Sequence, residues 1–134
     1  MARGQWVRIK ASSSAASFKR DKPAIEIACL QFISDVLKPK FLPEIHPTEF
    51  NYCIDIFGKW HGTNFRFIQR FRSNHPNSIG AEFDTAFTRL EYVGPDRFDL
   101  AYHRHTGEWN CLFRGLTLKE AFETIERQGH FHPI

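Results

Sequence analysis

The sequence contains no run of about 18 consecutive apolar residues, which is the length that a membrane-spanning helix needs. Residues 1–20 have no apolar core of the kind found in secretory signal peptides. They are rich in serine and arginine, as organellar transit peptides are, so a targeting role for this segment stays open. A chain of 134 residues, of which 42% are hydrophobic, can bury one core. We therefore expect one cytoplasmic domain.

Cysteine is scarce, and its spacing argues against the common structural uses. Cys29, Cys53 and Cys111 are odd in number and far apart, and no C-x-x-C pair is present. A zinc ribbon or a disulfide framework is therefore disfavoured, and reduced thiols are expected. The sequence also lacks the G-x-S-x-G, Walker and G-x-G-x-x-G motifs. Nothing in it indicates a cofactor or a small-molecule substrate.

Apolar residues recur at helical spacing after Asp21, which is a good N-cap residue, and Pro23 falls in the first turn. We expect this helix to end at Lys38, because Pro39 disfavours helical geometry in the residue before it. From Phe50 onward the apolar period changes to two, which is typical of strands. Five strands with short connections are predicted at 50–57, 64–72, 82–93, 97–105 and 109–114, with a turn at 58–62.

The last predicted element is a second helix. Thr117 and Glu120 have the spacing of a capping box, and Gly129 supplies a left-handed stop. The whole pattern predicts an α+β fold: an N-terminal helix, a five-stranded antiparallel meander and a C-terminal helix. Both helices are expected on one face of a curled sheet. The length of the third strand also predicts a β-bulge near Arg89.

Several motifs follow one another in a recognisable order. The first helix is followed by "NYCIDIFG" and "QRFR", and then by "AFTRLEYV", "RFDLAYHRHTGEWNCL" and "LTLKEAFETIERQGHF". From Pro23 to the end, this order resembles a small bacterial family known as domain of unknown function number three thousand and twenty-four. The resemblance implies the same fold and a bacterial or phage origin. It implies no mechanism, because the family has no established activity.

Positive charge is concentrated at the start of the chain. Residues 1–22 carry six Lys or Arg and one Asp, a net charge of +5, which leaves −2 for the rest of a chain whose total is +3. Because "SSSAAS" at 12–17 lacks periodicity, we expect a basic arm and linker at 1–20 and one α+β domain at 21–134. Such an arm suits an anionic partner or serves as a solvated tail that aids solubility. Its candidate contact residues are Arg3, Arg8, Lys10, Lys19 and Arg20.

The second predicted strand carries a row of arginines. Arg66, Arg70 and Arg72 lie on one side of it, and three phenylalanines lie on the other. Guanidinium groups pair with phosphate oxygens in a bidentate manner, so this face is a candidate nucleic-acid contact that Arg89 and Arg104 extend. The alternative is cross-strand pairing of these arginines with carboxylates, for which the sequence offers Glu82, Asp84 and Asp99.

Two His-x-His pairs are the weaker candidates. His103 and His105 share one strand face, and His130 and His132 lie near the C-terminus, so four imidazoles are available to a metal ion. Their spacing matches no known ligand signature, and a solvated strand face explains the first pair equally well. Cys111 near these histidines is a candidate nucleophile, but its alternation with Trp109 and Phe113 predicts a buried, inert thiol.

Taken together, these features predict a non-enzymatic module that binds an anionic partner. Nucleic acid or a nucleoprotein is the leading candidate, contacted by the basic arm and the arginine face. One alternative is a protein-interaction or inhibitor module of bacterial or phage origin. The other is a metal-dependent enzyme built on the four histidines. No membrane partner is expected.

Overall fold

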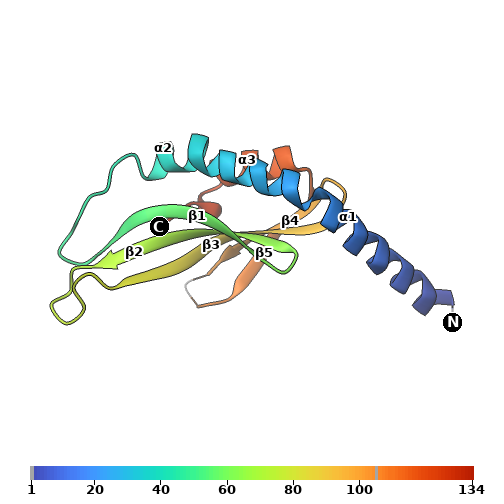
Figure 1. Cartoon of the computed structure of the whole chain (residues 1–134), viewed down its shortest axis with the longest axis horizontal. Coiled ribbons are helices and arrows are strands. Elements are labelled where there is room, and N and C mark those ends of the chain that lie inside the picture. The colour runs from blue at the N-terminus through green and yellow to red at the C-terminus, as the bar shows by residue number, and fades with distance from the viewer. Residues whose placement is uncertain (1, 105) are drawn as a thin grey trace.

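The structure is a computed structural model that describes residues 2–104 and 106–134, with side chains described from residue 15 onward within those ranges. The five strands form one antiparallel sheet in the order β1-β2-β3-β4-β5. Figure 1 shows the helices together on one face of this twisted, open sheet. The predicted α+β class, meander and terminal helices are confirmed. In chain order, the elements are α1 (Ala2–Phe32), a π-helical turn (Ile33–Leu37), α2 (Lys38–Phe41), β1 (Asn51–His61), β2 (Asn64–Ser73), β3 (Glu82–Gly94), β4 (Arg97–His103), β5 (Trp109–Leu116), α3 (Leu118–Arg127) and a 3-10 turn (Gly129–Phe131).

The first and last helices close a single hydrophobic core. Phe32 of α1 stacks on Phe122 of α3, with ring centroids 4.4 Å apart, and meets Phe67 of β2 edge-on at 6.2 Å. Burial of several aromatic rings in one cluster is a large favourable contribution to folding.

In the part of the chain that the structure describes, no helix combines the length and the hydrophobicity needed to cross a membrane.

The predicted start of the first helix at Asp21 and the linker at 12–17 are both wrong, because α1 runs from Ala2 to Phe32 without a break. Tertiary contacts explain the difference. Ser17 is buried, and the Phe18 ring packs edge-on against Trp60 and Tyr92, each at 5.2 Å. The segment predicted to be a linker therefore holds α1 onto the sheet.

Proline also fails to end the first helix. Pro39 lies in the first turn of α2, directly after a π-helical turn, and the helical path continues to Phe41. The wider π turn accommodates a residue that lacks an N–H and that would crowd the carbonyl four residues earlier. Pro23 lies inside α1, and Figure 1 shows that α1 bends near its middle, as helices do at an internal proline.

The first hairpin is longer than predicted. β1 continues to His61, and the turn is made by Gly62 and Thr63 instead of residues 58–62. Position 58 of the strand requires glycine, because a Cβ there would lie 2.1 Å from the Phe65 ring. Trp60, which falls within the turn predicted at 58–62, lies in β1 and packs edge-on against Phe65 at 5.3 Å.

Bulges in the strand pairing determine which side chains reach which face of the sheet. Ile54 in β1, Phe87 in β3 and Leu112 in β5 each lack a register partner on the neighbouring strand. The pairing passes directly from Cys53 to Asp55, from Ala86 to Thr88 and from Cys111 to Phe113. The bulge predicted near Arg89 is confirmed, two residues earlier, at Phe87. An extra residue reverses the alternation of side chains beyond it.

The bulge at Leu112 corrects the prediction for β5. Phe113 packs against Phe131 on the helix-covered face, as predicted. Cys111 pairs with Ala101, and Trp109 pairs with His103, so both lie on the other face of the sheet instead of in the core. Strict alternation had assigned all three side chains to one face.

Candidate functional site

The sheet has one face covered by the helices and one open face, and β2 places its arginines on the open face. Phe65 and Phe67 are buried against the helices, whereas Arg66, Arg70 and Arg72 alternate with them and project from the opposite side. The predicted separation of arginines from phenylalanines is confirmed. The three arginines nevertheless differ in what they contact.

Arg70 and Arg72 are paired with carboxylates of β3. Arg70 Nε donates a hydrogen bond of 2.9 Å to Asp84 Oδ1, and Arg72 Nη2 donates one of 2.8 Å to Glu82 Oε2. The bond from Arg70 holds the pKa of Asp84 below its usual value. This is the cross-strand pairing that the sequence left open, and such exposed pairs contribute only ~0.2–1 kcal/mol. The two arginines therefore offer less positive charge to a partner than Arg66 does.

Arg66 lies in the middle of a row of cations. It is the register partner of Lys59 on β1 and of Arg89 on β3, so three positive side chains stand side by side on neighbouring strands. We call these three residues the cationic row. None of them forms an ion pair with a carboxylate in the described part of the chain. Like charges directly opposite each other in a sheet are destabilising, so this arrangement is costly to the free protein.

A tryptophan borders the cationic row. The guanidinium carbons of Arg66 and Arg89 lie 5.4 and 5.0 Å from the centre of the Trp109 ring, and the His103 ring lies 4.9 Å from it. Arg66 Nε donates to Asn64 Oδ1 at 3.3 Å, whereas the buried Nε of Arg89 finds no hydrogen-bond partner within the described residues. Cation–π contacts of this kind contribute about 0.5–1 kcal/mol at exposed sites.

Small side chains on the open face let Trp109 approach the arginines. Ala101 separates β5 from β3 there, because it is the register partner of both Cys111 and Arg89. Ala101 is only 2% exposed although it lies on the open face, so larger neighbours cover it. The contact between the Arg89 guanidinium and the Trp109 ring was not predicted from the sequence, because strict alternation does not reveal the bulge at Leu112. One usable signal was the position of Trp109 directly across a tight turn from His103.

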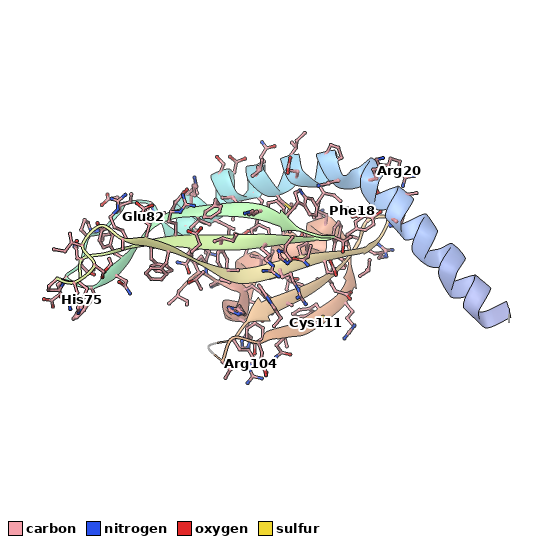
Figure 2. All side chains as sticks on the ribbon, turned by 60° about the horizontal axis from the view of Figure 1, so that its bottom comes forward. Phe18, Arg20, His75, Glu82, Arg104 and Cys111 are labelled. Carbon is pink, nitrogen blue, oxygen red and sulfur yellow. The ribbon has the colours of Figure 1, made fainter. Side chains whose placement is uncertain are left out.

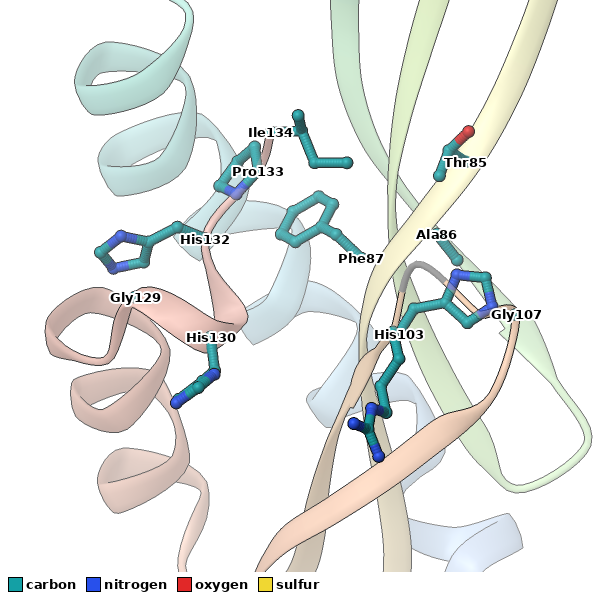
Figure 3. A pocket seen from close by; sticks show the side chains of 11 residues that line it. Thr85, Ala86, Phe87, His103, Gly107, Gly129, His130, His132, Pro133 and Ile134 are labelled. Carbon is teal, nitrogen blue, oxygen red and sulfur yellow. The ribbon is translucent and has the colours of Figure 1, made fainter.

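A pocket of about 460 Å³ adjoins this cluster. Figure 3 shows that its walls come from β3, from the hairpin between β4 and β5, and from the C-terminal segment. The C-terminal segment is fixed in place, because the Gln69 side chain accepts a hydrogen bond from Ile134 N at 2.8 Å and donates one to Ile134 O at 3.1 Å. The lining residues are Thr85, Ala86, Phe87, His103, Arg104, Gly107, Gly129, His130, His132, Pro133 and Ile134.

The pocket lies along a free strand edge. β3 pairs with β2 from Glu82 onward, but it pairs with β4 only from Thr88 onward. Over residues 82–87, one edge of β3 thus has no strand partner in the described ranges. Backbone N–H and C=O groups of a free edge remain available for hydrogen bonds to another molecule.

The histidines are spread over separate contacts. The His103 ring lies 4.9 Å from Trp109 in a tilted arrangement, the His130 ring lies 5.0 Å from Tyr102, and His132 Nε2 lies 2.8 Å from the carbonyl oxygen of Glu126. No group of three or more His, Cys, Asp or Glu side chains that could hold a metal ion occurs within residues 15–104 and 106–134. His105, the second member of the first pair, lies outside the described residues.

Cys111 makes no contact with a histidine among the interactions of the described residues. Its Sγ lies 3.5 Å from the carbonyl oxygen of Phe113. Asp99, which the sequence offered as a partner for the arginines, accepts a hydrogen bond of 3.0 Å from Gly115 N and lies 3.7 Å from Arg114 Nη1. In these contacts, neither a described histidine nor Asp99 is positioned to activate the Cys111 thiol as a nucleophile.

Comparison with known proteins identifies the family. The family model described as a domain of unknown function, DUF3024, matches residues 15–133. The chain is a member of the DUF3024 family. This confirms the resemblance found in the sequence, and the match begins earlier than Pro23, within the basic segment. No curated protein and no solved structure is significantly similar to the chain.

In this DUF3024 member, the basic arm is part of α1. The side chains of Arg3, Arg8 and Lys10 lie outside the described residues. Lys19 and Arg20 are exposed, and Arg20 Nε donates a hydrogen bond of 3.0 Å to Asp21 Oδ1. Figure 1 shows the N-terminal half of α1 projecting beyond the sheet, and Figure 2 shows Arg20 near the point where it departs. A projecting helix suits contact with a large partner better than with a small molecule.

Proposed function

We propose that this DUF3024 domain is a non-enzymatic module that binds nucleic acid through its open sheet face and its basic arm. The cationic row of Lys59, Arg66 and Arg89 carries the proposal. Three cations that form no ion pair within the described residues stand on adjacent strands and repel one another in the free protein, and a polyanion relieves that repulsion. A row of phosphates supplies negative charges at short, regular intervals, which a sheet-wide row of cations can meet.

The neighbours of the cationic row favour nucleic acid over an acidic protein. Trp109, with Arg66 and Arg89 at its ring and His103 beside it, combines flat apolar surface with guanidinium groups. Bases stack on aromatic rings and on guanidinium planes, whereas phosphates accept hydrogen bonds from guanidinium edges. The carboxylates of an acidic peptide would pair with the arginines, but they have no planar base to stack on the Trp109 ring.

The basic arm adds a second, sequence-independent contact. Residues 1–22 carry a net charge of +5 along a helix that projects from the sheet. Lysine and arginine side chains on such a helix release counterions when they bind phosphates, so the affinity falls as salt is added. The arm is expected to raise the affinity for any nucleic acid, and the cationic row to orient it on the sheet.

The proposal is tested by fluorescence anisotropy with labelled oligonucleotides at several salt concentrations. Changing Arg66→Gln and Arg89→Gln together should lower the affinity about tenfold and reduce the salt slope by roughly 1.4–1.8, the value for two lost phosphate contacts. The matched control is Lys119→Gln with Arg127→Gln, which removes two exposed charges from α3 on the helix-covered side. Equal losses in both double variants, or binding by the wild type that does not depend on salt, would contradict the proposal.

A second candidate function, a protein-interaction module, is favoured by an apolar patch at one end of the sheet. Phe50 and Ile79 are 69% and 73% exposed, and Phe83 is 43% exposed beside a stacked Phe71 ring 5.3 Å away. Exposed apolar residues that gather in one place often mark contacts with other proteins. Recovery of one protein partner by the wild type after nuclease treatment, and its loss with Phe50→Ser and Phe83→Ser, would support this second function.

A further inference from the structure

We propose that the pocket between β3, the β4–β5 hairpin and the C-terminal segment receives one nucleotide of a single strand, so that the domain prefers single-stranded nucleic acid to duplex. This inference rests on the nucleic-acid binding proposed above. It adds the substrate class and a specific place for a base. The observations behind it are the position of the pocket, its lining and its size.

The pocket continues directly from the cationic row. The His103 ring lies 4.9 Å from the Trp109 ring, tilted by 40°, and His103 also lines the pocket, so the two features share a residue. A strand whose phosphates follow Arg66 and Arg89 past Trp109 would therefore reach the pocket at His103. Figure 2 shows Arg104 at the tip of the β4–β5 hairpin, where it can meet the next phosphate.

The pocket lining suits a base and its sugar-phosphate. Two imidazole rings, His103 and His130, provide flat surfaces, and Phe87 provides apolar wall. The free edge of β3 over residues 82–87 offers backbone donors and acceptors to the edge of a base. No Asp or Glu side chain is among the described lining residues. A volume of about 460 Å³ falls within the ~300–1,000 Å³ of small-ligand sites.

A paired base cannot enter such a pocket. Bases in a duplex are stacked and hydrogen-bonded to their partners, whereas bases of a single strand are free to turn outward. Electrostatics alone gives the opposite preference, because duplex DNA carries one charge per ~1.7 Å of its axis and thus the higher charge density. Tighter binding of the single strand therefore requires contacts with bases.

The experiment compares a fluorescein-labelled single strand of about 12 nucleotides with the duplex of the same sequence, since single-strand sites span ~4–16 nucleotides. The wild type is expected to bind the single strand about tenfold more tightly at equal salt. Gly129→Leu should remove this preference and leave duplex binding unchanged. Gly129 lines the pocket, a Cβ there meets no heavy atom within 4 Å, and its φ lies outside the left-handed region, contrary to the stop predicted from the sequence. A leucine therefore adds apolar bulk at the pocket lining without a change in charge.

Two further variants make the test specific. Gln31→Leu places the same side chain on an exposed position of α1, away from the pocket, and should leave the preference intact. His130→Ala removes an exposed ring at the pocket and should weaken single-strand binding about fivefold, as loss of one stacking contact does. His130→Ala also keeps the test valid if Gly129→Leu fails to fold.

The outcomes separate this inference from the function on which it rests. Salt-dependent binding with no preference for single strands would overturn the inference and leave the nucleic-acid proposal standing. A single-strand preference that persists in both Gly129→Leu and His130→Ala would also overturn the role of the pocket. If neither oligonucleotide binds the wild type, the proposed function fails and the inference fails with it.

Discussion

The Tyr92 hydroxyl donates a hydrogen bond of 2.8 Å to Asp21 Oδ2, and this bond joins α1 to β3. The Oγ atom of Ser17 lies 3.0 Å from the same hydroxyl, one turn earlier on the helix. Tyr92 is buried, whereas the Asp21 side chain is 28% exposed, so the bond is partly shielded from water. The basic arm thus continues from a helix that a polar contact fixes to the sheet, which sets the direction in which the arm leaves the domain.

We predict that Tyr92→Phe destabilises the protein by about 1 kcal/mol, the usual contribution of one hydrogen bond. The ring and its edge-on contact with Phe18 at 5.2 Å remain, so the core packing is preserved and only the polar link is lost. Urea unfolding followed by circular dichroism measures the change. An unfolding midpoint equal to that of the wild type would show that the bond does not hold α1 in place.

The acid stability of the protein should depend on Asp21 and Asp84. Hydrogen bonds from Arg20 and then Tyr92 lower the pKa of Asp21, and one from Arg70 lowers the pKa of Asp84, from an ordinary value of 3.8. A carboxyl whose pKa is lower in the folded state stabilises the fold above 3.8, and this contribution is lost as the pH falls through the lowered value. Asp84→Asn should therefore flatten the loss of stability below pH 3.8. Unfolding free energies measured across the acid range test this, and an unchanged pH profile would contradict it.

Cysteine reactivity provides an independent check of the core. Cys29 is completely buried, and burial raises the pKa of its thiol to about 12. Cys53 and Cys111 are half-buried. Alkylation at pH 8 followed by mass spectrometry should modify these two before Cys29, which is expected to react only after unfolding in urea. Labelling of native Cys29 as fast as Cys53 would refute the position of α1 on the sheet.

Local patterns in the sequence were sufficient for most of the fold. The capping box of Thr117 and Glu120 is formed as predicted, with Glu120 N donating to Thr117 Oγ1 at 3.1 Å. The alternation of arginine and phenylalanine along β2 correctly separated the two faces of that strand. Both signals depend on residues near one another in the chain, which is why they can be interpreted without coordinates.

Features that depend on distant contacts could not be predicted. Phe18 of α1 packs against Trp60 of β1, which is distant in the sequence, and the open-face position of Trp109 depends on the extra residue at Leu112. A single inserted residue reverses every side chain beyond it, and nothing in the residue types announces it. The sequence predicted that Arg66 and Arg89 share one face, but not that Lys59 and Trp109 reach the same place from two other strands.

The cationic row leads to a prediction about stability as well as binding. Arg66 and Arg89 are register partners, and the described residues provide no carboxylate between them. Their mutual interaction in the free protein should therefore be repulsive, by several tenths of a kcal/mol at low salt. A double-mutant cycle of Arg66→Gln, Arg89→Gln and the double variant measures this coupling, including the part that passes through Trp109, which both guanidinium groups contact.

The sign and the salt dependence of the coupling between Arg66 and Arg89 show whether the two charges repel each other in the free protein. Repulsion should shrink as salt is raised toward 1 M, where the screening length is about 3 Å. Adding a saturating oligonucleotide should make the coupling favourable, because a bound phosphate would contact both guanidinium groups. The matched cycle with Arg70→Gln and Asp84→Asn should be favourable without any ligand, because that pair is already joined at 2.9 Å. An attractive coupling between Arg66 and Arg89 in the free protein would mean that the row is already neutralised, and the basis for a polyanionic partner would be lost.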